Sequence, residues 1–60
     1  MKIIKVFDHE KISDCLIAEK VPSYYAEYIA KDLNKRFSGD NSPDYFLAVE
    51  DHHKLYVFEP

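Results

Sequence analysis

The clearest pattern in the chain is a pair of apolar runs near its C-terminal end. Residues 45–49 and 55–58 are apolar without alternation, and the polar stretch 50–54 separates them. Strand-forming residues on either side of a short polar connection are typical of a β-hairpin. We therefore expect a hairpin over residues 44–59, with strands that are apolar on both faces.

The first third of the chain predicts two further strands. Residues 2–7 are β-branched and aromatic apart from two lysines, which favours a strand. Polar residues 8–11 make a break of hairpin-loop length, although it lacks the glycine of an ideal turn. Residues 12–21 fit either a strand or a short helix capped by Ser13. The strand before them and the stop at Pro22 favour the strand.

A helix is predicted over residues 23–37, because apolar residues recur there every three or four positions. Ser23 suits the N-cap, since its hydroxyl can accept a hydrogen bond from a free amide of the first turn. Glu27 and Lys31 stand at the spacing of a helical ion pair. Gly39 stands where a left-handed residue often ends a helix. The predicted apolar stripe consists of Tyr25, Ala26, Ile29, Ala30, Leu33 and Phe37.

Together these elements predict a single α+β domain over residues 1–60, in the order β-β-α-β-β, with one helix packed on a small antiparallel sheet. One helix covers one face of such a sheet, whereas the strands are apolar on both faces. The second face would then expose more apolar area than the largest patch of a typical monomer. Three interpretations stay open: tolerated exposure, a homodimer that packs sheet on sheet, and a face that binds a different protein. We favour the homodimer, because two-fold dimers are the commonest assembly.

Aromatic residues are the candidates for such a binding face. Phe46, Tyr56 and Phe58 lie on the expected hairpin, and we expect an outward-facing one to be replaceable by aspartate without loss of the fold. The pattern does not fix the strand register, and a one-residue shift in register would move each side chain to the opposite face of the sheet. Tyr24 points away from the helical stripe and Tyr28 lies on its flank. Tyrosines are enriched in binding hot spots, although a tyrosine there can also cover a neighbouring loop.

Composition and charge narrow the possible classes of function. A 47% hydrophobic share with a single glycine predicts a compact domain, although 60 residues are near the lower limit for one. The net charge of −3 opposes binding to nucleic-acid phosphates. A small nucleic-acid-binding module that stacks bases on an aromatic sheet face is therefore only the alternative function.

The sequence also predicts the cellular compartment of the protein. No apolar run approaches the roughly 20 residues of a membrane span, and no signal-peptide pattern is present. The chain has one cysteine, whereas small secreted domains usually carry several disulfides. These features predict a cytoplasmic protein without membrane association.

Few residues are candidates for chemistry. His9, His52 and His53 stand beside acidic residues in expected turns, and would bind zinc or nickel only if the two turns met. Solvent-exposed turn residues are the simpler interpretation. Cys15 has no neighbouring base or oxyanion donor and is better explained as small apolar filler. We therefore expect no catalytic residue, no metal, no cofactor and no enzyme activity.

A short helix rich in alanine, isoleucine and leucine precedes the C-terminal stretches 45–51 and 54–60. This arrangement is the basis of a resemblance that covers the whole chain. The chain resembles the small acidic accessory proteins of bacteriophages and prophages. That resemblance implies a module that binds and modulates, or inhibits, a host or defence protein in the host cytoplasm. It carries over no functional residues and does not identify the target.

Overall fold

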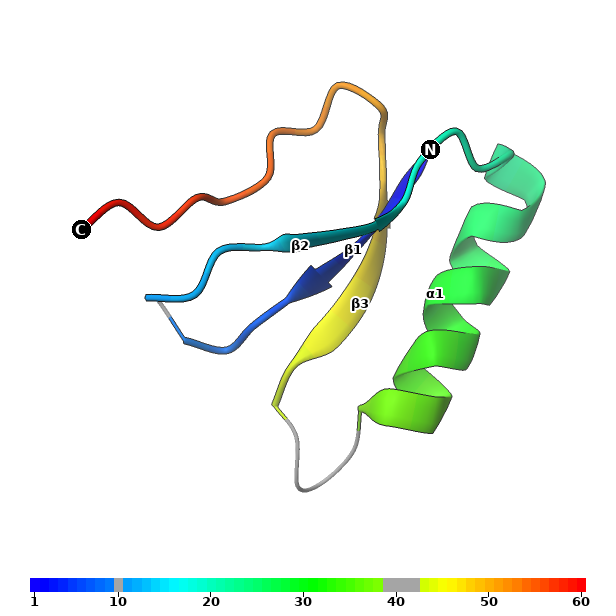
Figure 1. Ribbon diagram of the computed structural model, residues 1–60. Coiled ribbons are helices and arrows are strands. Elements are labelled where there is room, and N and C mark those ends of the chain that lie inside the picture. The colour runs from blue at the N-terminus through cyan, green and yellow to red at the C-terminus, as the bar shows by residue number, and fades with distance from the viewer. Residues whose placement is uncertain (10, 39–42) are drawn as a thin grey trace.

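Figure 1 shows the computed structural model of the chain, which describes residues 1–9, 11–38 and 43–60. The three strands form one antiparallel sheet in the order β2-β1-β3, so that the first strand lies in the middle. The predicted α+β architecture, one helix with a small antiparallel sheet, is confirmed. The elements in chain order are β1 (Lys2–Val6), β2 (Cys15–Ala18), α1 (Ser23–Phe37) and β3 (Tyr45–Val49).

The strand predicted over residues 12–21 is confirmed as a strand but is much shorter than expected. β2 has four residues. Before it, Ser13 and Asp14 hydrogen-bond to the C-terminal residues. After it, Lys20 takes a positive φ of 58°, a left-handed conformation that no strand can continue through. Polar partners at one end and a backbone reversal at the other therefore limit the strand.

The hairpin predicted over residues 44–59 is wrong in its second half, so the element order is ββαβ. β3 ends at Val49, and a turn follows in which the N–H of His53 donates to the carbonyl of Glu50 at 3.0 Å. No strand follows this turn in residues 54–60. The chain therefore leaves β3 instead of returning along it.

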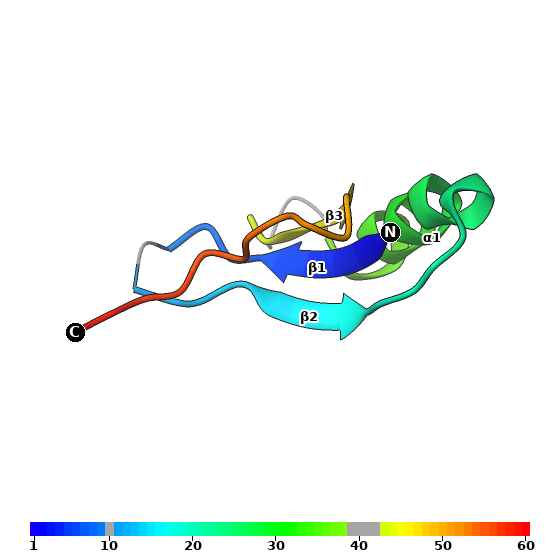
Figure 2. The same ribbon diagram turned by 90° about the horizontal axis from the view of Figure 1, so that it is seen from above.

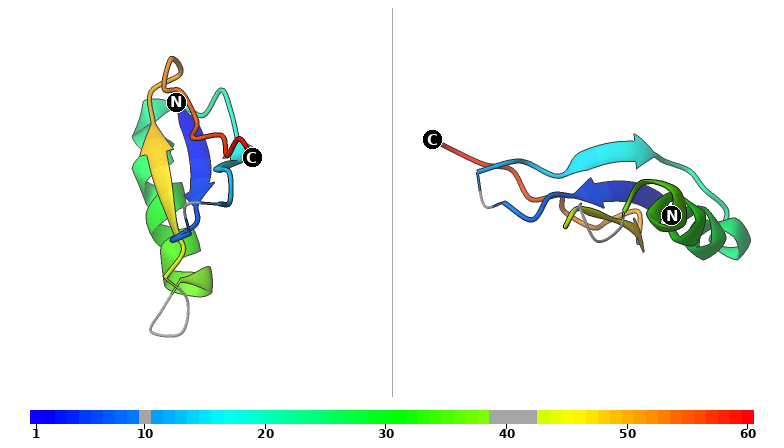
Figure 3. Two further views of the ribbon diagram at one scale, coloured as in Figure 1. Left: turned by 90° about the vertical axis from the view of Figure 1, so that its left-hand side faces the viewer. Right: turned by 90° about the horizontal axis from the view of Figure 1, so that it is seen from below.

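Residues 54–60, which we call the tail, run across the sheet on the side away from α1 and reach the segment before β2 (Figures 1 and 3). The molecule thus has three layers: α1, the sheet and the tail. Its extents are 35 × 28 × 11 Å, and the view from above shows how thin it is in the third direction (Figure 2). Three strands spaced about 4.8 Å apart account for that thickness.

The first turn of α1 is not capped as predicted. The cap position is Pro22 and not Ser23, and no side chain caps the free amides. Instead, the carbonyl of Pro22 accepts hydrogen bonds from the N–H groups of Tyr25 and Ala26, at 2.9 and 3.1 Å. Pro22 has φ −58° and ψ 138°, an extended backbone that suits an N-cap residue whose carbonyl accepts the first hydrogen bonds of the helix.

Two further helix predictions differ in outcome. The ion pair expected between Glu27 and Lys31 is absent, and the ion pair that α1 does form joins Arg36 Nε to Asp32 Oδ2 at 2.9 Å. Gly39, the expected end of the helix, lies outside the described residues.

The core between α1 and the sheet is built from small helical residues. Ile3 and Ala26 are fully buried and Ala30 nearly so. Alanines at these two positions let the helix approach the sheet closely. The predicted stripe is thus only partly buried, since Tyr25 and Phe37 are more than 60% exposed. The residues packed around this core are Met1, Ala18, Val21, Leu33 and Ala48.

The face of the sheet away from α1 is covered as well. Side chains alternate along a strand, so Ile4 points away from the helix that its neighbour Ile3 contacts. Ile4 is nevertheless only 1% exposed. The tail crosses this face, and its Leu55 and Phe58 are half-buried. The apolar second face that the sequence predicted is therefore covered, in part, by the chain's own C-terminal residues.

Candidate interaction surfaces

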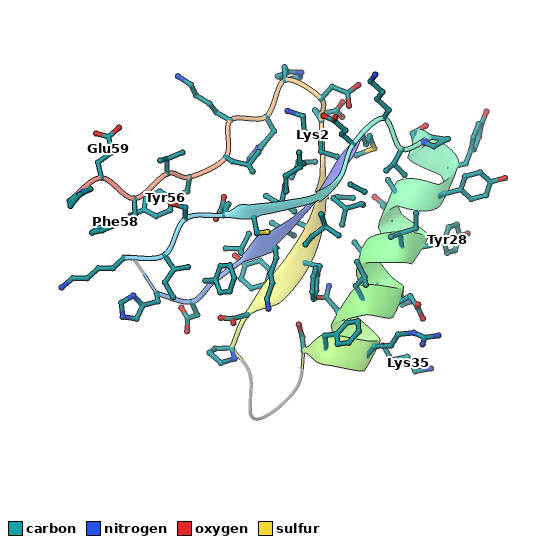
Figure 4. The ribbon with its side chains drawn as sticks, in the orientation of Figure 1. Lys2, Tyr28, Lys35, Tyr56, Phe58 and Glu59 are labelled. Carbon is teal, nitrogen blue, oxygen red and sulfur yellow. The ribbon has the colours of Figure 1, made fainter. Side chains whose placement is uncertain are left out.

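Three tyrosines stand exposed on the first two turns of α1. Tyr24, Tyr25 and Tyr28 are 82, 61 and 75% exposed. Residues three and four apart are neighbours on a helix surface, so these rings form one cluster, which we call the tyrosine surface. In Figure 4, Tyr28 and Lys35 project from α1 on the side away from the sheet.

The exposure of the tyrosine surface does not follow from the packing of α1. Ala26 and Ala30 fill the helical positions that face the sheet, so the aromatic rings are not needed there. Exposed tyrosine rings combine large contact area with few rotatable bonds, and such clusters are typical of protein-binding surfaces. The structure thus keeps Tyr24 and Tyr28 as candidates and adds Tyr25, which the sequence pattern assigned to the core.

Phe46 does not lie on an open face. It is only 6% exposed, and its ring centroid lies 6.3 Å from that of Phe37 on α1. The ammonium of Lys5 lies 5.7 Å from the same ring. Phe46 therefore belongs to the contact between α1 and β3, and replacing it by aspartate would bury a charge in that contact. The sequence could not reveal this, because β3 is apolar at both alternating sets of positions.

Tyr56 and Phe58 lie in the tail and not on a hairpin (Figure 4). The N–H of Asp14 donates to the carbonyl of Tyr56, and the N–H of Tyr56 donates to Asp14 Oδ2, both at 2.9 Å. The N–H of Phe58 donates to Ser13 Oγ at 2.9 Å. Tyr56 is 47% exposed and Phe58 is half-buried. Their backbone therefore fixes the tail beside the start of β2, and only part of each ring faces solvent.

The outer edge of β3 is closed by a side chain of α1. Asn34 Nδ2 donates to the carbonyl of Phe46 at 2.9 Å, and its Oδ1 accepts the N–H of Phe46 at 2.6 Å. One primary amide thus satisfies both polar groups of one strand residue, as a neighbouring strand would. Ser38 Oγ adds a bond to the carbonyl of Asp44 at 2.6 Å. The sequence analysis missed these bonds, because the position of Asn34 on the helix does not show which strand its amide will meet.

A groove of about 330 Å³ continues from Asn34 along the β3 edge. Its floor is apolar, whereas Glu27 and Lys31 bring opposite charges to its rim. No ion pair or hydrogen bond of the described side chains engages either charge. The groove is lined by Glu27, Ala30, Lys31, Asn34, Phe46, Leu47 and Ala48.

The β2 edge presents an apolar strand to solvent. Leu16 and Ile17 are each 44% exposed, and Cys15 is exposed. The pairing between β1 and β2 shifts its register between Ile3 and Ile4, which interrupts the regular ladder that an added strand would need. Cys15 is thus a surface residue and not apolar filler, and that prediction is wrong.

The histidines do not meet. The connection from β1 to β2, which contains His9, and the turn that contains His52 and His53 lie at opposite ends of the molecule (Figure 1). His9 Nδ1 accepts the N–H of Lys11 at 3.1 Å. Within residues 1–9, 11–38 and 43–60, no group of three potential metal ligands comes together.

Comparison with known proteins adds no relative. No protein-family model matches the chain, and no curated protein or solved structure is significantly similar to it. Among the residues that the structure describes, no helix has the length and apolar character to cross a membrane.

Proposed function

We propose that this chain is a protein-interaction module that binds another protein through the tyrosine surface of α1. The observation that carries the proposal is the clustering of Tyr24, Tyr25 and Tyr28, all more than 60% exposed, on a helix whose sheet-facing positions are already filled. The proposal involves no catalytic step. The likeness to phage accessory proteins favours a regulatory or inhibitory role against a host protein.

The structure gives less room for two other hypotheses, the sheet-on-sheet homodimer and nucleic-acid binding. A homodimer that packs sheet on sheet needs a free second face, and the tail crosses that face (Figure 3). Base stacking on the sheet needs open aromatic rings, whereas Phe46 is buried. Nucleic-acid binding therefore stays the alternative, and it is tested in the same experiment.

The test is an affinity capture from a lysate of the source cell, with the wild-type chain and with the double variant Tyr24→Ser/Tyr28→Ser. We expect a stoichiometric protein band that is insensitive to nuclease and is lost with the double variant, because two hot-spot rings are removed. Tyr45→Ser is the matched control, since Tyr45 is a 43% exposed tyrosine outside α1.

Circular dichroism should show unchanged folding for all three proteins, because the substituted rings lie at the surface. A band that survives the double variant would place binding elsewhere. If the captured material disappears after nuclease treatment, the result would favour the nucleic-acid alternative.

A further inference from the structure

The β3 edge contains backbone groups that point into the groove. Along an antiparallel strand, the polar groups of alternate residues point to the same side. Those of Phe46 point outward, since both bind Asn34. Those of Ala48, two residues on, therefore point outward too. β3 is an edge strand of the sheet, and outside the sheet ladder no hydrogen bond from a described residue reaches Ala48.

We propose that this groove binds the C-terminal end of a partner protein, added as a short fourth strand antiparallel to β3. An extended backbone supplies the donor and acceptor that Ala48 lacks, and the apolar floor at Ala30 and Phe46 accepts a side chain of that strand. The groove adjoins the tyrosine surface but shares no residue with it, and peptide binding read at Ala48 is measured apart from the capture test, so that either proposal can fail without the other.

Asn34 explains why the bound segment is a chain end. Its amide already occupies the position beside Phe46, so a strand that runs antiparallel to β3 from Val49 towards Phe46 must stop there. Lys31 lines the groove next to Asn34, one helical turn along α1. Its ammonium is placed to pair with the terminal carboxylate of the bound chain.

Glu27 sets a further requirement. It lies four residues before Lys31, about 6 Å along the helix axis at the usual rise, on the side of Val49. That distance equals about two residues of an extended strand. A partner that ends beside Lys31 therefore places its third residue from the end beside Glu27, where a lysine or arginine is favoured. The opposite strand direction would bring like charges together at both positions.

The probe is a synthetic peptide that ends in lysine, threonine and valine with a free carboxylate, titrated into the whole chain and followed through amide signals by NMR. We expect saturable shifts at Ala48, and at least about tenfold weaker binding for the same peptide with an amidated end, because a charge-assisted bond is lost. Equal binding of the two peptides, or no binding at millimolar concentration, overturns the proposal.

Two variants locate the charges. Lys31→Glu should weaken the free-acid peptide about tenfold, whereas Lys35→Glu, one turn further along α1 and outside the groove, should not. Glu27→Lys should shift the preference to a peptide with glutamate in place of its lysine. A Lys31→Glu variant that binds normally overturns the proposal.

The same NMR samples test a competing occupant. The β3 edges of two copies could pair with each other in place of a partner strand. A concentration-dependent dimer that involves Ala48 and that the peptide does not dissociate would assign the groove to a second copy, and would overturn the proposal.

Discussion

The two edges of the sheet are protected to different extents. At β3, the amide of Asn34 replaces a neighbouring strand, and it comes from a helix packed on the same strand, 12 residues away in sequence. At the other edge, the tail bonds to Ser13 and Asp14, which precede β2, across 42 to 45 residues and largely at the surface. Open edges invite pairing with other chains. The 60-residue chain thus closes part of its β3 edge from the core, whereas the tail holds only the segment before β2 and leaves that strand's own edge exposed.

The largest difference between the edges should appear when each strand loses a side chain. Phe46→Ala removes a buried ring from β3, for which we expect a loss of about 3–5 kcal/mol in the free energy of unfolding. Leu16→Ala on β2 should cost clearly less, because Leu16 is 44% exposed. Urea unfolding measures both. Equal losses would mean that β2 is as tightly packed as β3.

A smaller effect is expected from the amide that closes β3. Asn34→Ala leaves the N–H and the carbonyl of Phe46 without their partner in a partly buried site, which should cost about 1–3 kcal/mol. Asn34→Asp keeps an acceptor for the N–H but sets an oxygen against the carbonyl of Phe46, so it should also be less stable than the wild type.

Lys35→Ala, also on α1, serves as the surface control for this comparison and should be near neutral in urea unfolding. If Asn34→Ala is as mild as Lys35→Ala, the amide does not stabilise the edge.

The smallest effect should come from the bond that holds the tail. Asp14→Ala removes the carboxylate that accepts the N–H of Tyr56, at an expected cost of about 0.5–1.5 kcal/mol. Hydrogen exchange should show faster loss of protection at Tyr56, with the amides of β1 unchanged. Protection lost equally throughout the sheet would show that the tail is part of the cooperative core.

Local patterns predicted the parts of the fold that depend on local chemistry. The helical stripe predicted the bounds of α1, and β-branched residues identified β1. The preceding strand and the stop at Pro22 favoured β2, which was predicted longer than it is. The second hairpin strand failed because strand propensity in residues 55–58 says nothing about which edge they pair with. Phe46 was misplaced for a related reason, since two apolar faces leave the orientation of β3 undetermined. The Asn34 amide bonds depend on how α1 and β3 pack, which no spacing reveals.

The span of the tail bonds has a consequence for the order of folding. Closing a chain loop costs entropy that increases with its length, and the bond from Phe58 to Ser13 closes a loop of 45 residues. The pairing of β1 with β3 closes a loop of similar length, since Lys2 pairs with Val49, but it forms five paired positions beside the buried core. The hydrogen bonds of the tail lie largely at the surface and recover less of that entropy. We therefore expect the tail to join last as the chain folds, and to be the first segment to open in the native state. Until it joins, the side of the sheet that carries Ile4 is open to water, and to any other chain that reaches it first.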